Sequence, residues 1–246
     1  MNRHWRVEEL LITAIARMLD GLGHVAVGAS SPIPGAAALL ARARSGGQMR
    51  VSVLGSEHDN FFTDGGCELF DCAAQGRIDA FFLGGGQIDG AANINLVGVG
   101  GYPQSGVRFP GSFGSAYLYF LIPRVILFRE EHSPRVLVPK VDFVSAPGTS
   151  ARNVYRPGGP RALVTSRCVF TFESVSRCFR LSSIHPGHTV QEIVEQTGFD
   201  FEMSGTIGET TIPNRETLDL IRGPVADAIG RTYPAFARRL FADTAA

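Results

Sequence analysis

The chain has 246 residues, of which 44% are hydrophobic, and its 23 basic and 23 acidic residues give a formal net charge of zero. This length can bury one sizeable core, the lack of a basic stripe argues against a nucleic-acid partner, and no run of about 18 apolar residues would span a membrane. The first residues lack the apolar core of a signal peptide, so the cytoplasm is the expected location.

The first half of the chain alternates between helical and strand patterns. Apolar residues recur at helical spacing over residues 7–19, and Gly21 ends the run. A short strand is predicted over 24–28, a loop over 29–34 and an alanine-rich helix over 35–44. Further strands are predicted over residues 49–54, 78–83 and 124–128. Short apolar strands that alternate with helices predict an α/β sheet buried on both faces.

The pattern changes after Pro147. Three runs rich in β-formers, over residues 162–165, 168–172 and 178–181, predict a meander of antiparallel strands. Thr189 and Glu192 have the spacing of a capping box, which begins a helix that runs to Gln196. Helical segments are predicted near residues 214–222 and 225–240. Without a repeat or a long linker, residues 1–246 are expected to form one α/β domain with a small antiparallel β appendage near the C-terminal third.

The reactive side chains exclude several kinds of chemistry. Lys140 is the only lysine, and its setting fits neither a Schiff base nor a P-loop. The four cysteines, at positions 67, 72, 168 and 178, form no Cys-x-x-Cys pair, and we expect them to be buried reduced thiols. His58, His185 and His188 have no partners at a recognised ligand spacing, so no metal site is predicted.

Glycine is concentrated in one stretch. Ten of the 31 residues from Gly84 to Gly114 are glycine, and no Asp or Glu occurs from Gly90 to Arg129. Either the backbone approaches a ligand closely and presents its amides to an anion, or these residues form tight turns between strands. The stretch follows an apolar strand, and ligands of open α/β sheets bind at the carboxyl ends of strands, which favours a ligand site. The spacing does not match the Gly-x-Gly-x-x-Gly dinucleotide motif, so a Rossmann dehydrogenase is disfavoured.

Several motifs in this region resemble the beta subunit of glutaconate CoA-transferase and its relatives in the class I CoA-transferase family. In chain order they are Gly84-Gly85-Gly86-Gln87-Ile88-Asp89, Asn93-Ile94-Asn95, Gly98-Val99-Gly100 and Arg108-Phe109-Pro110-Gly111-Ser112. Further matches are the segment from Lys140 to Gly148, which resembles an Asp-Tyr-Val-Thr-Ser-Pro-Gly motif, and His185-Pro186-Gly187 with the segment from Glu195 to Phe199. The resemblance extends over residues ~5 to ~225.

The resemblance implies an open, CoA-transferase-like sheet of the NagB/RpiA type, flanked by helices, with an active site between an alpha-type and a beta-type chain. It implies that the backbone amides of Gly84, Gly85 and Gly86 form an oxyanion loop that polarises the thioester carbonyl. The acyl-CoA site would be lined by Gly98, Gly100, Arg108, Gly111 and Ser112. Gln87, Asp89, Asn93 and Asn95 would hold these loops, because short amide and carboxylate side chains can replace backbone partners in turns. CoA is expected only as part of the substrate, and no bound cofactor is predicted.

Family members of the transferase type attack the acyl-CoA with a glutamate in a Glu-Ser-Gly segment. The corresponding segment here is Val53-Leu54-Gly55, so a valine occupies the nucleophile's position and cannot accept an acyl group. Val53, beside Phe61 and Phe62, is expected to make the acyl pocket more apolar. The nearest carboxylate, Glu57, stands next to His58 and would be the nucleophile after a shift of register; the alternative is a solvated loop after a strand.

Relatives that lack this glutamate resemble the hydrolase of steroid-degrading bacteria, which opens a ring of a CoA-linked steroid remnant with a glutamate from the alpha-type partner. The resemblance therefore implies a beta-type subunit of a C–C bond hydrolase of cholesterol catabolism, within a heterotetramer of two alpha-type and two beta-type chains. A CoA-transferase acting on a small acyl-CoA and a non-catalytic structural subunit stay open as alternatives. A serine thioesterase is disfavoured because no Gly-x-Ser-x-Gly motif occurs.

Overall fold

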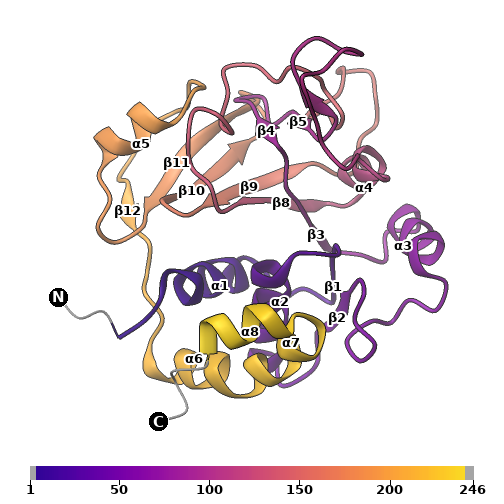
Figure 1. Ribbon diagram of the computed structural model, residues 1–246, viewed down its shortest axis with the longest axis vertical. Helices are drawn as coiled ribbons and strands as arrows, with labels where there is room; N and C mark the ends of the chain where they lie inside the picture. The colour runs from indigo at the N-terminus through magenta and orange to yellow at the C-terminus, as the bar shows by residue number, and fades with distance from the viewer. Residues whose placement is uncertain (1–3, 242–246) are drawn as a thin grey trace. The chain divides into compact units, whose positions relative to one another are not determined.

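A computed structural model describes residues 4–241 of the chain. These residues form two compact units: the first comprises residues 4–82 and 211–241, and the second comprises residues 83–210. Both units combine strands with helices, so the predicted α/β class is confirmed (Figure 1). The single domain expected over residues 1–246 stays a prediction. Within residues 4–241, we find no helix that is both long and apolar enough to cross a membrane.

The sheet of the first unit is parallel. Strand β1 (His24–Val27) pairs with β2 (Arg50–Val53) along its whole length, from His24 opposite Arg50 to Val27 opposite Val53. On its other side β1 pairs with β3 (Ala80–Leu83) through Val25 and Ala80. All residues of β1 and β3 are buried, as expected of parallel strands covered on both faces. The three strands predicted from the first 83 residues are therefore confirmed.

Helices from both ends of the chain belong to the first unit. Helix α1 spans Val7–Met18, α2 spans Pro32–Arg44 and α3 spans Gly65–Ala74. The C-terminal helices are α6 (Arg215–Leu220), a π-helical turn (Ile221–Val225), α7 (Ala226–Thr232) and α8 (Pro234–Phe241). Helix α2 contacts α1, α7 and the π-helical turn, so N-terminal and C-terminal segments share one core (Figure 1).

Two helix boundaries differ from the prediction for a reason that involves proline. Helix α2 starts at Pro32 rather than at residue 35, because proline is well suited to the first helical position, where its missing N–H costs no hydrogen bond. The helix predicted over 225–240 is wrong as one element, since Pro234 begins a new helix after Tyr233. Helix α3 was not predicted, because its two leading glycines are poor helix formers.

A buried carboxylate joins α1 to the C-terminal segment of the first unit. Glu9 is fully buried and accepts hydrogen bonds from Arg222 Nε at 2.7 Å and Nη2 at 3.0 Å, and from the Arg6 amide at 2.8 Å. The Glu9 side chain thus serves both the start of α1 and the π-helical turn.

Replacement of this carboxylate is expected to destabilise the protein. Glu9→Ala should lower the free energy of unfolding by about 2 kcal/mol, since it leaves Arg222 and the Arg6 amide without their acceptor, although Arg222 keeps some contact with water. The matched control is Glu8→Ala. Glu8 Oε1 lies 2.9 Å from Nη1 of Arg239, whose side chain is largely exposed, so this substitution should lower the free energy of unfolding by under about 1 kcal/mol. Urea unfolding monitored by circular dichroism measures both; equal losses would contradict the role given to Glu9.

The second unit contains a mixed sheet. Strand β8 (Arg124–Arg129) runs parallel to β9 (Pro160–Thr165), and β9, β10 (Cys168–Glu173) and β11 (Cys178–Ile184) form an antiparallel meander. The meander confirms the predicted antiparallel appendage, while the parallel pairing of β8 with β9 was not predicted. The short strand β12 (Gly208–Glu209) runs parallel to β11.

Helix α5 (Val190–Gln196) begins at the predicted capping box, in which Thr189 Oγ1 accepts from the Glu192 amide at 3.2 Å and Glu192 Oε2 accepts from the Thr189 amide at 2.8 Å. This part of the prediction is confirmed.

The glycine-rich stretch also contains regular structure. Strands β4 (Gln87–Ile88) and β5 (Ile94–Asn95) form one small antiparallel sheet, and β6 (Gly98–Val99) and β7 (Val107–Arg108) form another (Figure 1). Helix α4 (Ser115–Leu121) follows them. Neither the four strands nor α4 was predicted. The strands are each two residues long, which is too short to show a periodicity in the sequence.

Candidate functional site

The turn at residues 84–86 is crowded enough to require glycine. A Cβ on Gly84 would lie 3.1 Å from the Phe128 carbonyl oxygen, and one on Gly85 would lie 2.7 Å from the Ile94 side chain. A Cβ on Gly86 would overlap the ring of Phe109. The backbone therefore passes close to its neighbours at all three positions, and the need for glycine is strongest at Gly85, where a Cβ would also lie 2.8 Å from the Gln87 carbonyl oxygen.

Not all three amides of this turn are equally available to a ligand. The Gly86 amide donates to the Asn95 carbonyl oxygen at 2.9 Å, so it already closes the hairpin of β4 and β5. The amides of Gly84 and Gly85 are therefore the better candidates for the oxyanion loop that was predicted over Gly84, Gly85 and Gly86. The assignment of this loop to catalysis stays a prediction.

Asn95 is the centre of the hydrogen bonds that fix the hairpin. It is fully buried, and its Nδ2 donates to Gln87 Oε1 and to the Gly98 carbonyl oxygen, both at 2.7 Å. Its Oδ1 accepts from the amides of Val97 at 2.9 Å and Gly98 at 3.2 Å. One side chain thus connects β4, β5 and the start of β6.

Asp89 and Asn93 close the turn between β4 and β5. Asp89 Oδ1 accepts from the amides of Ala91 at 3.1 Å and Asn93 at 3.0 Å, and its Oδ2 accepts from Asn93 Nδ2 at 3.1 Å. Asn93 Oδ1 in turn accepts from the Gly148 amide at 3.1 Å. Both side chains hold backbone in the way expected of an Asx turn, and they attach the hairpin to the segment around residue 148.

Asp142 and Ser145, for which no individual role was predicted, also form hydrogen bonds that hold the glycine segments. Asp142 Oδ2 accepts from Gln87 Nε2 at 3.2 Å and from the Gly100 amide at 2.8 Å, while the Asp142 amide donates to Gln87 Oε1 at 3.0 Å. Ser145 Oγ donates to the Ile94 carbonyl oxygen at 2.8 Å and accepts from the Leu96 amide at 3.0 Å. Both lie in the Lys140–Gly148 motif, so that motif was the signal that could have identified them.

The remaining predicted acyl-CoA residues lie on or after β6 and β7. Gly98 has no room for a Cβ beside the Val107 carbonyl oxygen, and Gly100 and Gly111 have positive φ values of 97° and 114°. Arg108 is exposed, with its guanidinium 5.9 Å from the centre of the Tyr102 ring. The Ser112 carbonyl oxygen accepts from the Ser115 amide at 2.7 Å at the start of α4.

The surface of this part of the chain is unusually apolar. Five large apolar side chains there are exposed: Val99, Tyr102, Val107, Phe113 and Tyr117. The structure thus combines an exposed apolar surface with one arginine and several constrained glycines, which suits a ligand that has both apolar and anionic groups.

Val53 is part of the buried core of the first unit. It is 1% exposed at the end of β2, and one of its methyl groups would lie 3.9 Å from a Cβ on Gly35, so its side chain packs toward α2. Of the two phenylalanines that follow in the chain, Phe61 stacks on Arg50 at 5.2 Å, and Phe62 lies 5.8 Å from the ring of His24. The segment after residue 59 thus folds back along β2 toward Arg50, and the apolar acyl pocket expected of Val53, Phe61 and Phe62 stays a prediction.

The loop after Val53 is closed by its own hydrogen bonds. The Val53 amide donates to the Asp59 carbonyl oxygen at 2.6 Å, and Ser56 Oγ accepts from the Asp59 amide at 3.0 Å. Glu57 and His58 are exposed at the tip of this loop. The buried carboxylate here is Asp59, whose Oδ1 accepts from Arg42 Nη2 at 2.7 Å. This geometry favours a solvated position for Glu57 and a structural role for Asp59.

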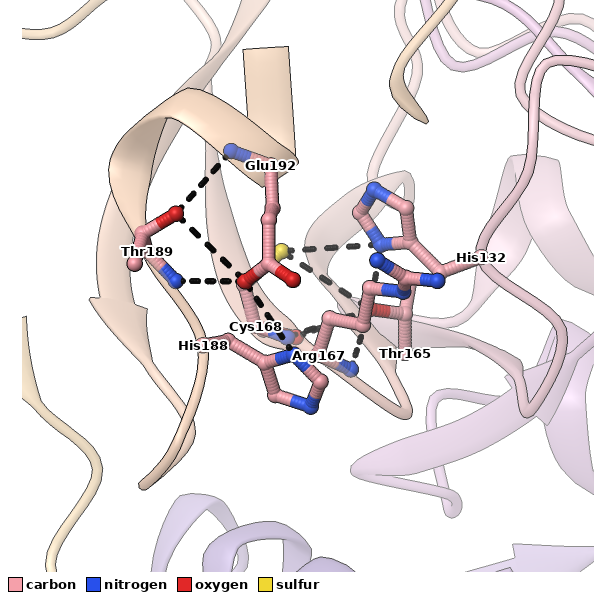
Figure 2. Close-up of polar contacts among 7 residues, drawn as sticks. All are labelled: His132, Thr165, Arg167, Cys168, His188, Thr189 and Glu192. Atoms are coloured by element: carbon pink, nitrogen blue, oxygen red, sulfur yellow. Dashed lines mark hydrogen bonds and ion pairs between the residues drawn. The ribbon is translucent and has the colours of Figure 1, made fainter. Parts of the chain in front are cut away.

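A second polar cluster lies under the meander of the second unit (Figure 2). His132 is buried, with Nδ1 2.8 Å from Thr165 Oγ1 and Nε2 3.0 Å from Thr197 Oγ1. The Cys168 thiol lies 3.8 Å from His132 Nδ1 and 3.7 Å from Thr165 Oγ1. Burial raises the pKa of Cys168 to about 12. The thiol therefore stays protonated at neutral pH and is no nucleophile.

The cysteines are only in part as expected. All four are free thiols, but only Cys168 is buried; Cys67 is exposed, and Cys72 and Cys178 are half-buried. The expectation of four buried thiols is therefore wrong for the other three. Among residues 4–241, no group of three or more histidine, cysteine or acidic side chains is arranged to hold a metal ion.

The arrangement of the glycine segments agrees with the result of a comparison with protein families. The family model described as Coenzyme A transferase matches residues 8–196, which is more than half of the chain. The chain belongs to the coenzyme A transferase family.

Curated relatives and solved structures from this family share only part of the sequence. One of the two subunits of 3-oxoadipate CoA-transferase from Pseudomonas knackmussii is 33% identical over 153 residues, which cover 60% of this chain and 58% of that protein. The cholesterol ring-cleaving hydrolase IpdB subunit from Rhodococcus jostii is 28% identical over 172 residues, or 63% of this chain and 62% of that protein. The chain thus spans less than two thirds of the length of these relatives.

Similarity in three dimensions extends further along the chain. Rhodococcus jostii IpdAB has a TM-score of 0.79 at 25% identity, covering 90% of this chain and 94% of that chain. The decarboxylase AibA/AibB has a TM-score of 0.76 at 25% identity, covering 96% of this chain and 98% of that chain. The CoA-transferase-like sheet predicted from the motifs is therefore confirmed.

Proposed function

We propose that this chain is the beta-type subunit of a heteromeric enzyme that acts on an acyl-CoA thioester in the cytoplasm. The observation that carries the proposal is the hairpin of β4 and β5, in which Asn95 and Asp142 hold the glycine turn beside the crowded Phe109 ring. Rigid amides aimed at a carbonyl oxygen stabilise the negative charge that develops there during attack. Membership of the coenzyme A transferase family supports the same assignment.

We further propose that the reaction is hydrolysis of a C–C bond in a ring of a CoA-linked intermediate of steroid catabolism. Water adds to a ring ketone, the adjacent ring C–C bond breaks to give a carboxylic acid, and the departing carbon keeps the electron pair and takes up a proton. Val53 supports this choice over group transfer, because its buried aliphatic side chain cannot form an acyl-enzyme. Similarity to the IpdB subunit also supports it.

The proposed reaction needs a general base, and neither acidic side chain of the loop after Val53 is placed to be that base. Glu57 is exposed, and Asp59 is occupied by Arg42 at 2.7 Å. An alpha-type partner is proposed to provide a carboxylate for this step, in an assembly of two alpha-type and two beta-type chains. The paired names of the decarboxylase AibA/AibB and of IpdAB are consistent with a two-subunit enzyme. Purified alone, the chain should have no turnover.

The reaction is tested with the two-chain complex and a CoA thioester that carries a cyclic dione. In water enriched in oxygen-18, mass spectrometry should detect a ring-opened acid with one labelled oxygen in its new carboxyl group, and hydroxylamine should trap no enzyme-bound glutamyl thioester. Exchange of CoA onto acetate or succinate without ring opening would support the transferase instead. Release of carbon dioxide would indicate the activity in the name of AibA/AibB.

The role of Glu57 is tested by Glu57→Gln in the same complex. Turnover should stay within about twofold of the wild type, because the side chain is a solvated loop residue and surface substitutions of this kind are usually close to neutral. Glu209→Gln, a substitution of an exposed glutamate in the other unit, is the matched control. A loss of a hundredfold or more in Glu57→Gln alone would identify Glu57 as the nucleophile and restore the transferase alternative.

A further inference from the structure

A cavity of about 430 Å³ in the second unit has no assigned role. Its walls come from the segment of residues 148–161 at the start of β9, from the end of β10 and from the turn that leads to β11. The volume is in the range of small-molecule sites, which is roughly 300–1,000 Å³. All of its lining residues lie within one unit, so its shape does not depend on the other part of the chain.

The charge of this cavity is strongly one-sided. Four arginines line it, namely Arg152, Arg156, Arg161 and Arg177, and no Asp or Glu is among the lining residues. Arg152, Arg161 and Arg177 are exposed, and within residues 4–241 none of the four takes part in an ion pair. The carboxylate of Glu173 close by in sequence is used by Arg180 at 2.9 Å. Among the described residues, therefore, no carboxylate oxygen lies within 4.0 Å of these four guanidinium groups.

Arg156 fixes the inner wall of the cavity. Its guanidinium donates to the carbonyl oxygens of Gly158, Pro147 and Tyr119, each at 2.9 Å, and stacks on the Tyr119 ring at 5.1 Å. These partners are neutral, so its positive charge stays uncompensated while its geometry is held. Burial lowers the pKa of Arg156, because the charged guanidinium is held partly out of water.

Polar backbone and an apolar floor complete the site. Gly148 and Gly158 line the cavity, and neither has room for a Cβ: one on Gly148 would overlap the Ala91 carbonyl group, and one on Gly158 would lie 2.5 Å from the Ile122 carbonyl oxygen. The hydroxyls of Thr149 and Ser174 also belong to the lining, as does the buried ring of Phe172. A cavity lined by four arginines, by residues with hydroxyl groups and by one aromatic residue suits an organic phosphate better than a simple carboxylate.

We propose that this cavity binds a ligand that carries more than one phosphate group. The planar guanidinium pairs with phosphate oxygens through two parallel hydrogen bonds, and several phosphates can each receive an arginine from a different segment. The attraction acts at the surface, so binding should weaken as salt screens it. The proposal does not rest on the acyl-CoA reaction, since the arginines and the cavity would bind phosphates in an enzyme of any activity.

Two sources of such phosphates are distinguished by the choice of probe. One is the nucleotide end of CoA, represented by adenosine 3′,5′-bisphosphate; the other is a free phosphate compound, represented by ADP and by inorganic pyrophosphate. The cavity lies next to the proposed acyl-CoA site: Gly148, which lines the cavity, donates its amide to Asn93 Oδ1 in the β4–β5 hairpin at 3.1 Å.

The test is isothermal titration calorimetry of the two-chain complex with each of the three probes. At least one should bind saturably, and Arg161→Gln and Arg177→Gln should each weaken binding tenfold or more, while the exposed control Arg215→Gln changes it less than twofold. Competition of adenosine 3′,5′-bisphosphate with the thioester substrate would assign the cavity to the end of CoA. Binding of ADP or pyrophosphate without such competition would assign it to a separate ligand.

Two results would overturn the proposal. One is the absence of saturable binding by all three probes up to millimolar concentration, and the other is binding that neither Arg161→Gln nor Arg177→Gln weakens. Both results are independent of ring cleavage, which is measured by the ring-opened acid and not by calorimetry.

Discussion

Asn95→Asp is expected to abolish turnover of the assembled enzyme and to lower the free energy of unfolding by about 4 kcal/mol. The new carboxylate oxygen would face Gln87 Oε1 and the Gly98 carbonyl oxygen, each 2.7 Å from the present Nδ2, so two donated hydrogen bonds become contacts between acceptors. The side chain is fully buried, and a charge there has no water to compensate it. Thermal unfolding and kcat/KM measure the two losses.

Asn95→Ala separates the hydrogen bonds from the introduced charge. It should cost about 3 kcal/mol, because it leaves the amides of Val97 and Gly98 and the Gly98 carbonyl oxygen without this partner, while Gln87 Oε1 keeps the Asp142 amide and no repulsion is added. The exposed Asn153→Ala is the control in the same unit and should change neither property. If both Asn95 variants unfold normally and keep wild-type kcat/KM, the hairpin is not the element that positions the thioester, and a structural role for the chain gains support.

The parallel strands and the capping box could be predicted because local signals and tertiary structure agree there. Residues 24–27 and 50–53 combine β-forming side chains with burial. The predicted strands, 24–28 and 49–54, end within one residue of the observed ones. Thr189 and Glu192 satisfy each other's backbone amides within four residues, so no distant contact is needed. Elements of this kind can be predicted because the residues that determine them are close together in the sequence.

The small sheets of the glycine stretch could not be predicted because distant residues determine them. The β4–β5 hairpin receives hydrogen bonds from residues about fifty positions away: Asp142 bonds to Gln87, and Ser145 bonds to Ile94. Strands of two residues have no periodicity of their own. The motifs therefore predicted candidate residues, while the contacts that hold them became visible only in three dimensions.

The environment of Val53 was hidden for a similar reason. The sequence does not show that the loop from Val53 to Asp59 closes on itself and returns the chain along β2. The rings of Phe61 and Phe62 consequently contact Arg50 and His24 at the opposite end of the strands. The arginine cavity was also beyond prediction, since its charges come from two segments, residues 148–161 and the turn between β10 and β11, that are brought together only in three dimensions.

Lowering the pH from 7 to 5 is expected to destabilise the second unit through two buried histidines near Cys168 (Figure 2 shows His132). Burial, with the nearby charge of Arg167, lowers the pKa of His132 to about 4, and burial lowers the pKa of His185 to about 4. His185 Nε2 lies 2.9 Å from the Thr165 carbonyl oxygen, which only accepts, so Nε2 carries the proton of the neutral ring.

The sign of the effect follows from the direction of these shifts. Both folded pKa values lie below the value of about 6.5 expected in the unfolded chain, so the unfolded chain binds protons first as the pH falls. The contribution of each neutral imidazole is complete above about pH 6.5 and is lost progressively down to about pH 4. Each ring should account for about 2 kcal/mol between pH 7 and pH 5, or about 4 kcal/mol together.

Double substitution of His132→Gln and His185→Gln should flatten this pH dependence, because glutamine keeps a hydrogen-bonding side chain that does not titrate. The measurement is the free energy of unfolding in urea at pH 7, 6 and 5, compared as a slope so that a uniform loss of stability in the variant does not matter. His58→Gln, at an exposed loop, is the matched control and should keep the wild-type slope. A wild-type slope in the double variant would show that other groups cause the acid sensitivity, and that protonation of the Thr165–His132–Thr197 cluster costs the fold little.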